Sequence, residues 1–188
     1  MEKERISWAP GTMIYPLPAI LVSCGADEKE YNALTVSWVG TICSSPAMCY
    51  ISVRPERHSY EIIKRTGEFV LNLTTEQMAF ATDWCGVKSG KDFNKFKEMN
   101  LTIGAAEKVK APIVLESPIN IECKVCEVIN LGSHDMFLAD IVNVRADERL
   151  FEGEKLCINR AHLCAFAHGE YYELSNRIGK FGFSVKKK

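Results

Sequence analysis

The chain has 188 residues, the length of one sizeable domain, and 47% of them are hydrophobic while 25% are charged. This balance excludes wholesale disorder and allows a normal buried core. The formal net charge of -1 shows no basic excess of the kind that nucleic-acid-binding proteins carry. We therefore expect a single domain over residues 1–188 that has no nucleic-acid partner.

The sequence also lacks the signals of a membrane or exported protein. The apolar stretch at residues 13–22 is interrupted by Pro16 and Pro18 and is too short to span a bilayer. Charged residues dominate the first five positions and no apolar run follows them, so we expect no signal peptide. The eight cysteines are then interpreted as reduced thiols, and the chain as a cytoplasmic protein with no membrane partner.

Six stretches rich in Val, Ile, Phe and Tyr, bounded by turn-forming residues, predict β-strands. In chain order they are residues 19–24, 33–37, 48–53, 69–73, 119–130 and 136–145. Leu-Gly-Ser-His-Asp separates the last two and is typical of a hairpin loop. Ile119, Ile121, Cys123 and Val125 alternate with polar residues, which predicts a half-buried antiparallel strand.

Three short helices are predicted between these strands. Residues 58–66 form the first, and Gly67 is expected to terminate it. Thr74, with Gln77 three residues later, is expected to open a second helix that ends near Trp84. Asp92 is expected to cap a third that runs to residue 99. Because no βαβ alternation is present, the pattern favours a mainly β fold, an antiparallel barrel, over a doubly wound sheet.

Several familiar motifs fail on spacing. Residues 86–92 resemble a phosphate loop, but the glycines are one residue too close and Asp92 replaces the required Ser or Thr. Cys123 and Cys126 lie at odd spacing in a strand, which sends their side chains to opposite faces. Neither a dinucleotide-binding glycine fingerprint nor a serine nucleophile elbow is present. No metal site is predicted, because standard spacing is also missing from Cys157, His162, Cys164 and His168.

The stretch from Asn32 to Ser59 concentrates residues suited to binding. Thr35 and Ser37 lie on one face of a predicted strand that ends at Trp38. A polar loop is expected over residues 41–46. Ser59 lies at the start of the helix predicted over residues 58–66. A hydroxyl group at the positive, N-terminal end of a helix is suited to binding a phosphate group.

Seven segments, taken in order and spacing, carry a resemblance that covers nearly the whole chain. They resemble the flavin reductase-like family of FMN-binding split barrels and, within it, the flavoredoxin branch. The resemblance implies an antiparallel Greek-key split β-barrel with a few short helices and noncovalently bound FMN. Ala47 stands where the family often has a second proline. The segments are Asn32-Ala-Leu-Thr-Val-Ser-Trp38, Cys43-Ser-Ser-Pro46, His58-Ser-Tyr60, Gly67-Glu-Phe-Val-Leu-Asn72, Ser89-Gly-Lys-Asp-Phe-Asn-Lys-Phe96, Leu131-Gly-Ser-His-Asp135 and Gly179-Lys-Phe-Gly-Phe-Ser-Val185.

The resemblance implies a role for each matching position. Asn32 and Trp38 border the isoalloxazine ring, and Ser59 binds the phosphate. Lys95 supplies the cation, with Lys91 as the competing candidate. His134, the one possible catalytic residue, lies near the flavin or an incoming nicotinamide. The remaining cofactor contacts are strand residues, a loop that serves the ring edge and ribityl chain, and a ring cover: Thr35 and Ser37; Thr41, Cys43, Ser44 and Ser45; and Phe166.

Each of these residues has an ordinary structural alternative. Trp38 is also suited to core packing, Asn32 to a turn and Ser59 to a helix cap. Lys95 and His134 are equally typical of solvated surface positions. The site interpretation therefore depends on the joint occurrence of these residues in the family order.

The resemblance implies an oxidoreductase that moves electrons from NAD(P)H through FMN to free flavin, a metal complex or a redox protein. No side-chain nucleophile is required, because the cofactor performs the difficult chemistry. An alternative is a flavoredoxin-like electron carrier without its own NAD(P)H turnover. A second alternative is a zinc- or ligand-binding barrel without flavin. The family also implies a homodimer with FMN near its interface.

Overall fold

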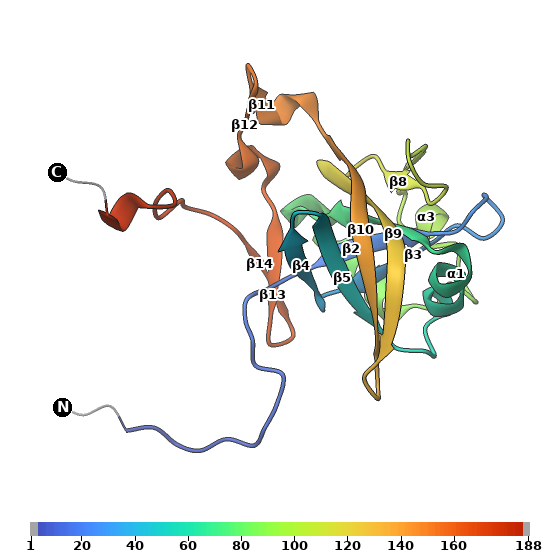
Figure 1. The fold of residues 1–188 in the computed structure, drawn as a ribbon, viewed down its shortest axis with the longest axis horizontal. Coiled ribbons are helices and arrows are strands. Elements are labelled where there is room, and N and C mark those ends of the chain that lie inside the picture. Colours follow the sequence, from blue (N-terminus) through green and yellow to red (C-terminus); the bar gives the residue numbers. More distant parts are fainter. Residues whose placement is uncertain (1–3, 186–188) are drawn as a thin grey trace.

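Seven antiparallel strands form the main sheet of the computed structural model, which describes residues 4–185 (Figure 1). Their order across the sheet is β3-β2-β6-β9-β10-β5-β4. Their bounds are β2 Ile20–Cys24, β3 Asn32–Val36, β4 Val39–Ser44, β5 Ala47–Val53, β6 Glu68–Leu73, β9 Ile119–Asn130 and β10 Asp135–Ala146. The helices are α1 His58–Thr66, α2 Ala79–Val87 and α3 Lys95–Glu98.

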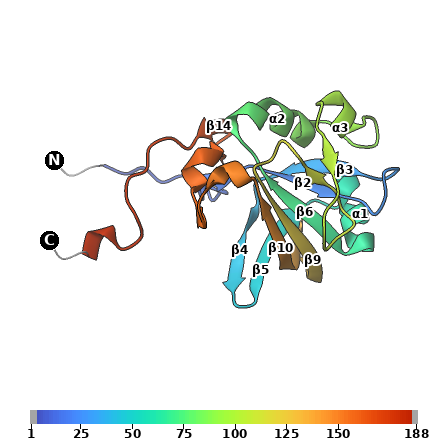
Figure 2. The same ribbon diagram turned by 90° about the horizontal axis from the view of Figure 1, so that it is seen from above.

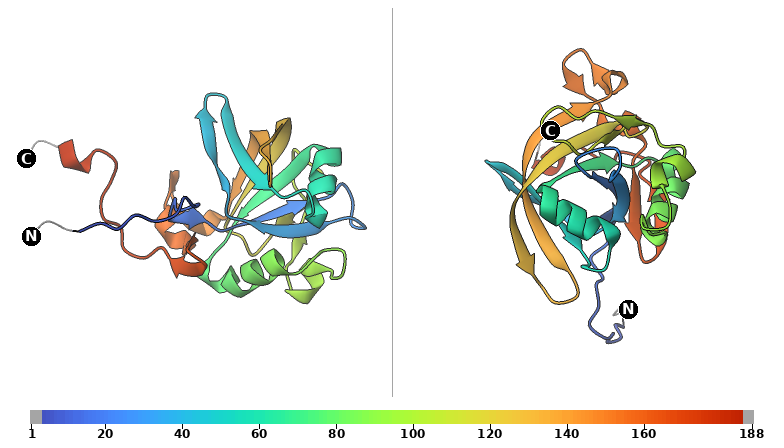
Figure 3. Two further views of the ribbon diagram at one scale, coloured as in Figure 1. Left: turned by 90° about the horizontal axis from the view of Figure 1, so that it is seen from below. Right: turned by 90° about the vertical axis from the view of Figure 1, so that its right-hand side faces the viewer.

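The two edge strands, β3 and β4, are consecutive in the chain and are joined by Ser37 and Trp38. β3 pairs with β2 while β4 pairs with β5, so two residues carry the chain from one end of the sheet to the other. The N–H of Ser52 in β5 donates to the carbonyl of Trp38 at 2.8 Å. The sheet therefore curls into a barrel, which the right-hand view of Figure 3 shows end-on with α1 across its mouth. The predicted antiparallel split barrel is confirmed.

The long hairpin of β9 and β10 also shapes the barrel. Its pairing shifts register between Leu138 and Ala139 and again between Ile141 and Asn143. Such bulges increase the local twist and bend a strand, which favours a curled sheet. Along β9, Cys123 is buried, whereas Cys126, which lies at the first of these register shifts, is exposed.

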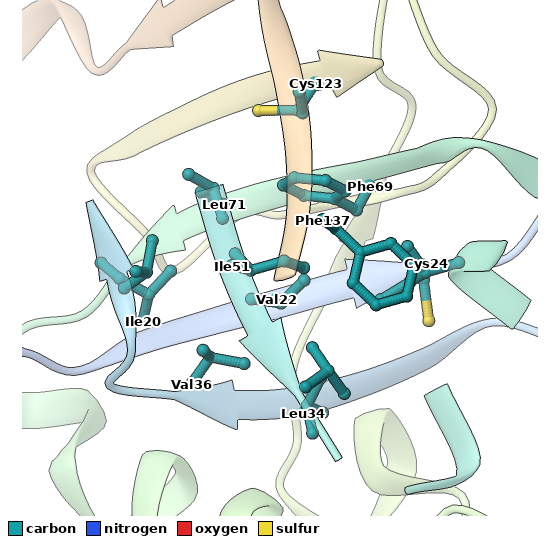
Figure 4. Close-up of a cluster of buried hydrophobic side chains, with 14 of the residues drawn as sticks. Ile20, Val22, Cys24, Leu34, Val36, Ile51, Phe69, Leu71, Cys123 and Phe137 are labelled. Atoms are coloured by element: carbon teal, nitrogen blue, oxygen red, sulfur yellow. The ribbon is translucent and has the colours of Figure 1, made fainter. Parts of the chain in front are cut away.

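The barrel encloses the main cluster of buried apolar side chains (Figure 4). Alternate residues of its strands point inward, and Phe69 and Phe137 are the largest that are fully buried. A second cluster lies on the other face of β2 and β3, where Leu21 and Ala33 pack with residues of α2 and α3. Because β2 is covered on both faces, all five of its residues are buried.

Helix α1 has the predicted bounds, and Gly67 ends it with a left-handed backbone (φ 67°) and an N–H bond to the Ile63 carbonyl. The prediction that Thr74 caps the second helix is wrong. The Thr74 hydroxyl is buried and donates to the carbonyl of Ala19 instead. Thr75 caps the short 3-10 turn Glu76–Met78, and α2 follows directly after it.

The third helix is also shorter than predicted. It begins at Lys95 because the side chain of Asn94, and not that of Asp92, accepts a hydrogen bond from the N–H of Lys97. Figure 2 shows α2 and α3 together on one side of the barrel, with the hairpin of β4 and β5 projecting from the other.

Short strands complete the fold. β1 Leu17–Pro18, β13 Cys164–Ala167 and β14 Glu170–Glu173 form a small sheet, from which both ends of the chain lead away (Figure 1). Within residues 4–185, no helix is long and apolar enough to cross a bilayer. The remaining pairs are β7 Ile103–Gly104 with β8 Ile113–Val114, and β11 Phe151–Glu152 with β12 Lys155–Leu156.

Replacement of Phe137 tests the barrel core. Its ring is fully buried and packs edge-to-face against Tyr60 of α1, with 5.4 Å between ring centroids. We expect Phe137→Ala to lower the free energy of unfolding by about 3–5 kcal/mol, as buried Phe-to-Ala changes do. Urea unfolding monitored by circular dichroism measures this. Val144→Ala is the control, since Val144 lies on the same strand but is 55% exposed; an equal loss in both would contradict the packing assignment.

Candidate functional site

A hollow of about 480 Å³, which we call the polar hollow, lies where the start of α1 meets β3 and the loop that follows α2. Three elements distant in sequence build its wall, so the barrel topology is what brings the residues together. They are Asn32, Leu34, Arg54, Glu56, Arg57, His58, Ser59, Lys88, Ser89, Gly90 and Lys95.

Two predicted site residues meet directly in this hollow. The Asn32 side-chain amide donates to the Ser59 hydroxyl at 2.7 Å, and both residues are buried. Gly90 packs so closely on Asn32 that a Cβ atom there would lie 2.3 Å from Oδ1 of Asn32. This close approach requires glycine at position 90 and gives that glycine a packing role. Asn32 thus lies beside Ser59 in the wall of the polar hollow, which does not include Trp38.

Lys95 places a buried ammonium group in the wall of the polar hollow. The residue is 4% exposed, and its Nζ donates to the carbonyl of Cys85 at 2.6 Å. Cys85 lies in the last turn of α2, where carbonyl groups lack helical partners and a cation is favoured. Burial lowers the pKa of Lys95 to about 8, and the charge of Arg57 acts in the same direction. An ammonium held this way is suited to an anionic ligand.

The electrostatic balance of the polar hollow is strongly positive. Arg54, Arg57, Lys88 and Lys95 face it, against the single carboxylate of Glu56 in its wall. Burial and then the charges of Lys91 and Lys95 lower the pKa of His58 below its ordinary value. Such a cluster of cations is suited to a phosphate group.

The start of α1 adds backbone donors to this positive field. Arg57 stands at the N-cap position and gives no side-chain cap hydrogen bond, and Ser59 is the second helical residue. The first N–H groups of a helix have no partner within the helix, and they point toward a ligand at its N-terminus. The hollow therefore offers a hydroxyl group, helix N–H groups and cations to one anion.

A second hollow of about 260 Å³ continues from the first along β3. Leu34, Arg54 and Arg57 belong to both, so the two form one elongated site. We call the second the aromatic hollow, because its wall contains Trp38, His134 and Phe166. The rest of its wall is formed by Thr35, Val36, Ser37, Ser52 and Val53.

The aromatic wall combines side chains from three strands or loops. The rings of Trp38 and His134 lie with centroids 4.3 Å apart, inclined at 60°. The Phe166 ring, on β13, packs edge-to-face on Tyr171 at 5.3 Å. Burial, followed by the charge of Arg54, lowers the pKa of His134. The lowered pKa favours the neutral imidazole, which can donate through one nitrogen and accept through the other.

The structure separates one predicted group from the site. Thr41, Cys43, Ser44 and Ser45 belong to the hairpin that projects from the barrel (Figure 2), and none of them lines either hollow. The loop expected after Trp38 is in fact strand β4, because residues 39–44 pair with β5.

The structure also places the two candidate lysines and the two hydroxyl residues that were predicted for the site. Lys91 is exposed and outside the wall of both hollows, whereas Lys95 is inside the polar one. The Thr35 hydroxyl donates to the carbonyl of Thr82 in α2, so it braces the strand against the helix. Ser37 keeps its expected place beside Trp38.

Sequence reasoning missed three cations of the site, Arg54, Arg57 and Lys88. The two arginines immediately precede Ser59 and its helix, so the same helix-end argument that selected Ser59 would have selected them. The sequence offered no comparable signal for Lys88. Among the described residues, the one His/Glu grouping with a metal-like arrangement is Glu76, His162 and Glu173, all exposed, and it includes no cysteine.

Comparison with known proteins identifies the family. A family model described as the flavin reductase like domain matches residues 12–175, and this chain belongs to that family. A solved structure of flavoredoxin from Desulfovibrio vulgaris (Miyazaki F) is 30% identical, with a TM-score of 0.89 over 98% of this chain and 100% of that chain.

Two further relatives extend this comparison. Flavoredoxin from Methanosarcina acetivorans shares the fold, with 23% identity and a TM-score of 0.87 over 98% of this chain and 100% of that one. The reductase component of a 4-nitrophenol 4-monooxygenase/4-nitrocatechol 2-monooxygenase from Rhodococcus opacus is 24% identical, over 67% of this chain and 64% of that protein.

The buried ammonium of Lys95 predicts a specific pH dependence of stability. Its folded pKa of about 8 lies below its ordinary value of 10.5, so between these pH values the unfolded chain binds a proton that the folded chain does not. The stability of the ligand-free protein should therefore rise from pH 8 to pH 10.5, by up to about 3 kcal/mol from this group.

Urea unfolding of wild-type protein and Lys95→Met at several pH values measures this rise. Lys95→Met should lack it, so the difference between the two proteins should change with pH. Lys97→Met, an exposed neighbour on the same helix, should follow the wild type. Parallel pH curves for all three proteins would contradict a buried, charged Lys95.

Proposed function

We propose that this chain binds FMN along β3 and passes electrons through it. The phosphate group would occupy the polar hollow and the ring the aromatic hollow. The observation that carries the proposal is their continuity, since a cationic hollow at a helix N-terminus runs directly into one walled by Trp38 and Phe166. Membership of the flavin reductase like family supports it.

The residues of the site fit the two ends of FMN. A phosphate monoester carries roughly 1.5 to 2 negative charges at neutral pH. Lys95 and the arginines would neutralise it, while Ser59 and the first N–H groups of α1 would donate hydrogen bonds to its oxygens. At the other end, Trp38 and Phe166 would give the ring flat apolar contact.

When bound, FMN supplies the redox chemistry, accepting electrons from a reductant and returning them to an acceptor. The chain's own residues bind and orient the cofactor and exclude water around the ring. His134, held against Trp38 and with its pKa lowered by burial, would offer a hydrogen bond beside the ring or to an incoming nicotinamide. This is the role we assign to it in the proposal.

We favour NAD(P)H as the reductant, and free flavin, a metal complex or a redox protein as the acceptor. The similarity to a monooxygenase reductase component supports this choice. The second candidate is an electron carrier that exchanges electrons with other proteins without its own NAD(P)H turnover. Similarity to two flavoredoxins over nearly the whole chain favours that candidate.

A homodimer and a cytoplasmic location complete the proposal. Phe166 of the aromatic hollow lies on β13, which pairs with β1 at Leu17. The small sheet of these strands lies where both chain ends leave the barrel (Figure 2). A second copy that packs there would lie close to the aromatic hollow, in keeping with a cofactor near the dimer interface.

Replacement of Lys95 tests the phosphate assignment. Lys95→Met removes the buried ammonium but keeps an apolar chain of similar length. Hydrogen bonds to charged groups contribute about 1.5–3 kcal/mol, so we expect FMN to bind at least tenfold more weakly. Titration of apoprotein with FMN, followed by quenching of flavin fluorescence, measures the dissociation constant.

Two controls sharpen this test. Lys97→Met should leave FMN affinity unchanged, because Lys97 is exposed and outside the hollow. Riboflavin, which lacks the phosphate group, should bind wild type and Lys95→Met equally. In the wild type, FMN affinity but not riboflavin affinity should fall as pH rises above about 8, where Lys95 loses its proton. Equal losses for both flavins would remove Lys95 from the phosphate site.

Anaerobic stopped-flow mixing separates the reductase from the carrier. If the chain is a reductase, NADH or NADPH should bleach the absorption band of the bound flavin within seconds. A carrier should bleach slowly with both nucleotides yet rapidly with dithionite. Purified protein that is colourless and takes up no added FMN would instead defeat the flavin proposal and leave a barrel without flavin.

A further inference from the structure

The segment after β14 leaves the barrel as an extended arm. We call residues 174–185 the C-terminal arm. The N–H of Leu174 donates to the carbonyl of Leu163 at 3.0 Å, and beyond this anchor the arm runs away from the body (Figures 1 and 2). Ile178 is 95% exposed, Phe181 fully exposed and Val185 81% exposed. Exposed apolar side chains of this size are typical of segments that bind another molecule.

The arm and the body carry opposite charges. All 24 acidic residues of the chain precede Leu174, together with 18 of the 23 basic residues, so residues 1–173 carry a formal charge of -6. The 15 residues from Leu174 to the end contain the other five basic residues and carry +5; Arg177 and Lys180 lie in the arm, and the three lysines that follow it supply the rest. The arm is therefore cationic and apolar, and the body of this same chain is electrostatically complementary to it.

An apolar hollow lies at the root of the arm. Its volume is about 220 Å³, and its wall includes Pro16, Pro18, Leu73, Leu163 and Leu174. A cavity of roughly 150 Å³ holds a benzene molecule, so this hollow has room for an aromatic side chain. The arm of the same chain extends away from it. The chain thus carries both an exposed aromatic segment and an apolar recess that this segment does not fill.

We propose that the C-terminal arm is a clasp exchanged between two copies of this chain, with its apolar side chains, Phe181 foremost, seated in the root hollow of the other copy. A two-fold axis near the roots makes the exchange reciprocal, since each arm leaves from the wall of the hollow that receives its partner. Phe181 lies seven residues beyond Leu174 and reaches about 23 Å when extended.

The comparisons treat the arm differently from the barrel. The family model ends at residue 175, so nearly all of the arm lies beyond the part of the chain that this model matches. The structural match to Desulfovibrio vulgaris flavoredoxin covers 98% of this chain and therefore reaches into the arm. The proposal deepens the homodimer proposed above and names the segment that holds it together.

Sedimentation equilibrium of the full-length, flavin-loaded protein tests the clasp. The wild type should be a dimer, and Phe181→Ser should raise its dissociation constant at least tenfold. Phe80→Ser is the matched control, since Phe80 is 76% exposed on α2 and should leave association unchanged. A monomeric wild type, an unchanged Phe181→Ser dimer, or equal weakening by both substitutions would overturn the proposal.

Cross-linking shows which copy the arm contacts. A mixture of unlabelled and ¹⁵N-labelled chains, left to exchange subunits, is treated with an amine-reactive cross-linker, and peptides that contain Lys180 are analysed by mass spectrometry. Mixed-isotope pairs between Lys180 and the body are expected. Pairs of a single isotope alone would show that each arm folds back on its own body, which would overturn the exchange.

Two further measurements separate this inference from its alternatives. Sedimentation with phosphatidylglycerol vesicles should leave the dimer in solution, and arm-dependent pelleting of monomers would assign the arm to membranes and overturn the clasp. FMN affinity is measured separately by fluorescence titration. Loss of the dimer with retained FMN binding supports the clasp alone, and a colourless dimer that depends on Phe181 would support the clasp while defeating the proposed cofactor.

Discussion

The two-residue link between β3 and β4 is the constraint on which the site depends. Because Ser37 and Trp38 join the two edges of one sheet, the sheet must curl, and β3 comes to face the start of α1. The same crossing brings Trp38 next to His134 at the far end of the chain's longest hairpin. One element of backbone topology therefore creates an elongated site with a cationic end and an aromatic end.

At the cationic end of the site, several positive side chains lie close together around the buried Lys95. Lys95 is buried, and burial together with the charge of Arg57 lowers its pKa, so the charged form of Lys95 destabilises the ligand-free fold. An anion in the hollow would relieve the repulsion among these cations, so ligand binding and stability would be linked. The contact of Nζ with the Cys85 carbonyl holds the ammonium in position until an anion arrives. A residue retained at such a cost to stability fits a binding role better than a purely structural one.

Local patterns predicted the strands that alternate clearly and the helix α1 with its glycine terminator. They failed where local signals were ambiguous or absent. Thr74 and Thr75 are equally good caps in sequence, and burial of one decides between them. Residues 41–46 were expected to form a polar loop, yet pairing with β5 makes residues 39–44 a strand. The bond between Asn32 and Ser59 joins residues 27 positions apart, so only the barrel topology brings them together.

The small sheet at the chain ends connects association with the site. β13 carries Phe166 into the aromatic hollow, while its neighbour Leu163 holds the root of the C-terminal arm through the N–H of Leu174. A second copy that clasps the root would pack against this sheet and so restrain the wall of the aromatic hollow. A wall that is already restrained loses less conformational entropy when a flat ligand binds against it, so the affinity for such a ligand would rise. By reciprocity, a bound ligand would strengthen the dimer by the same factor.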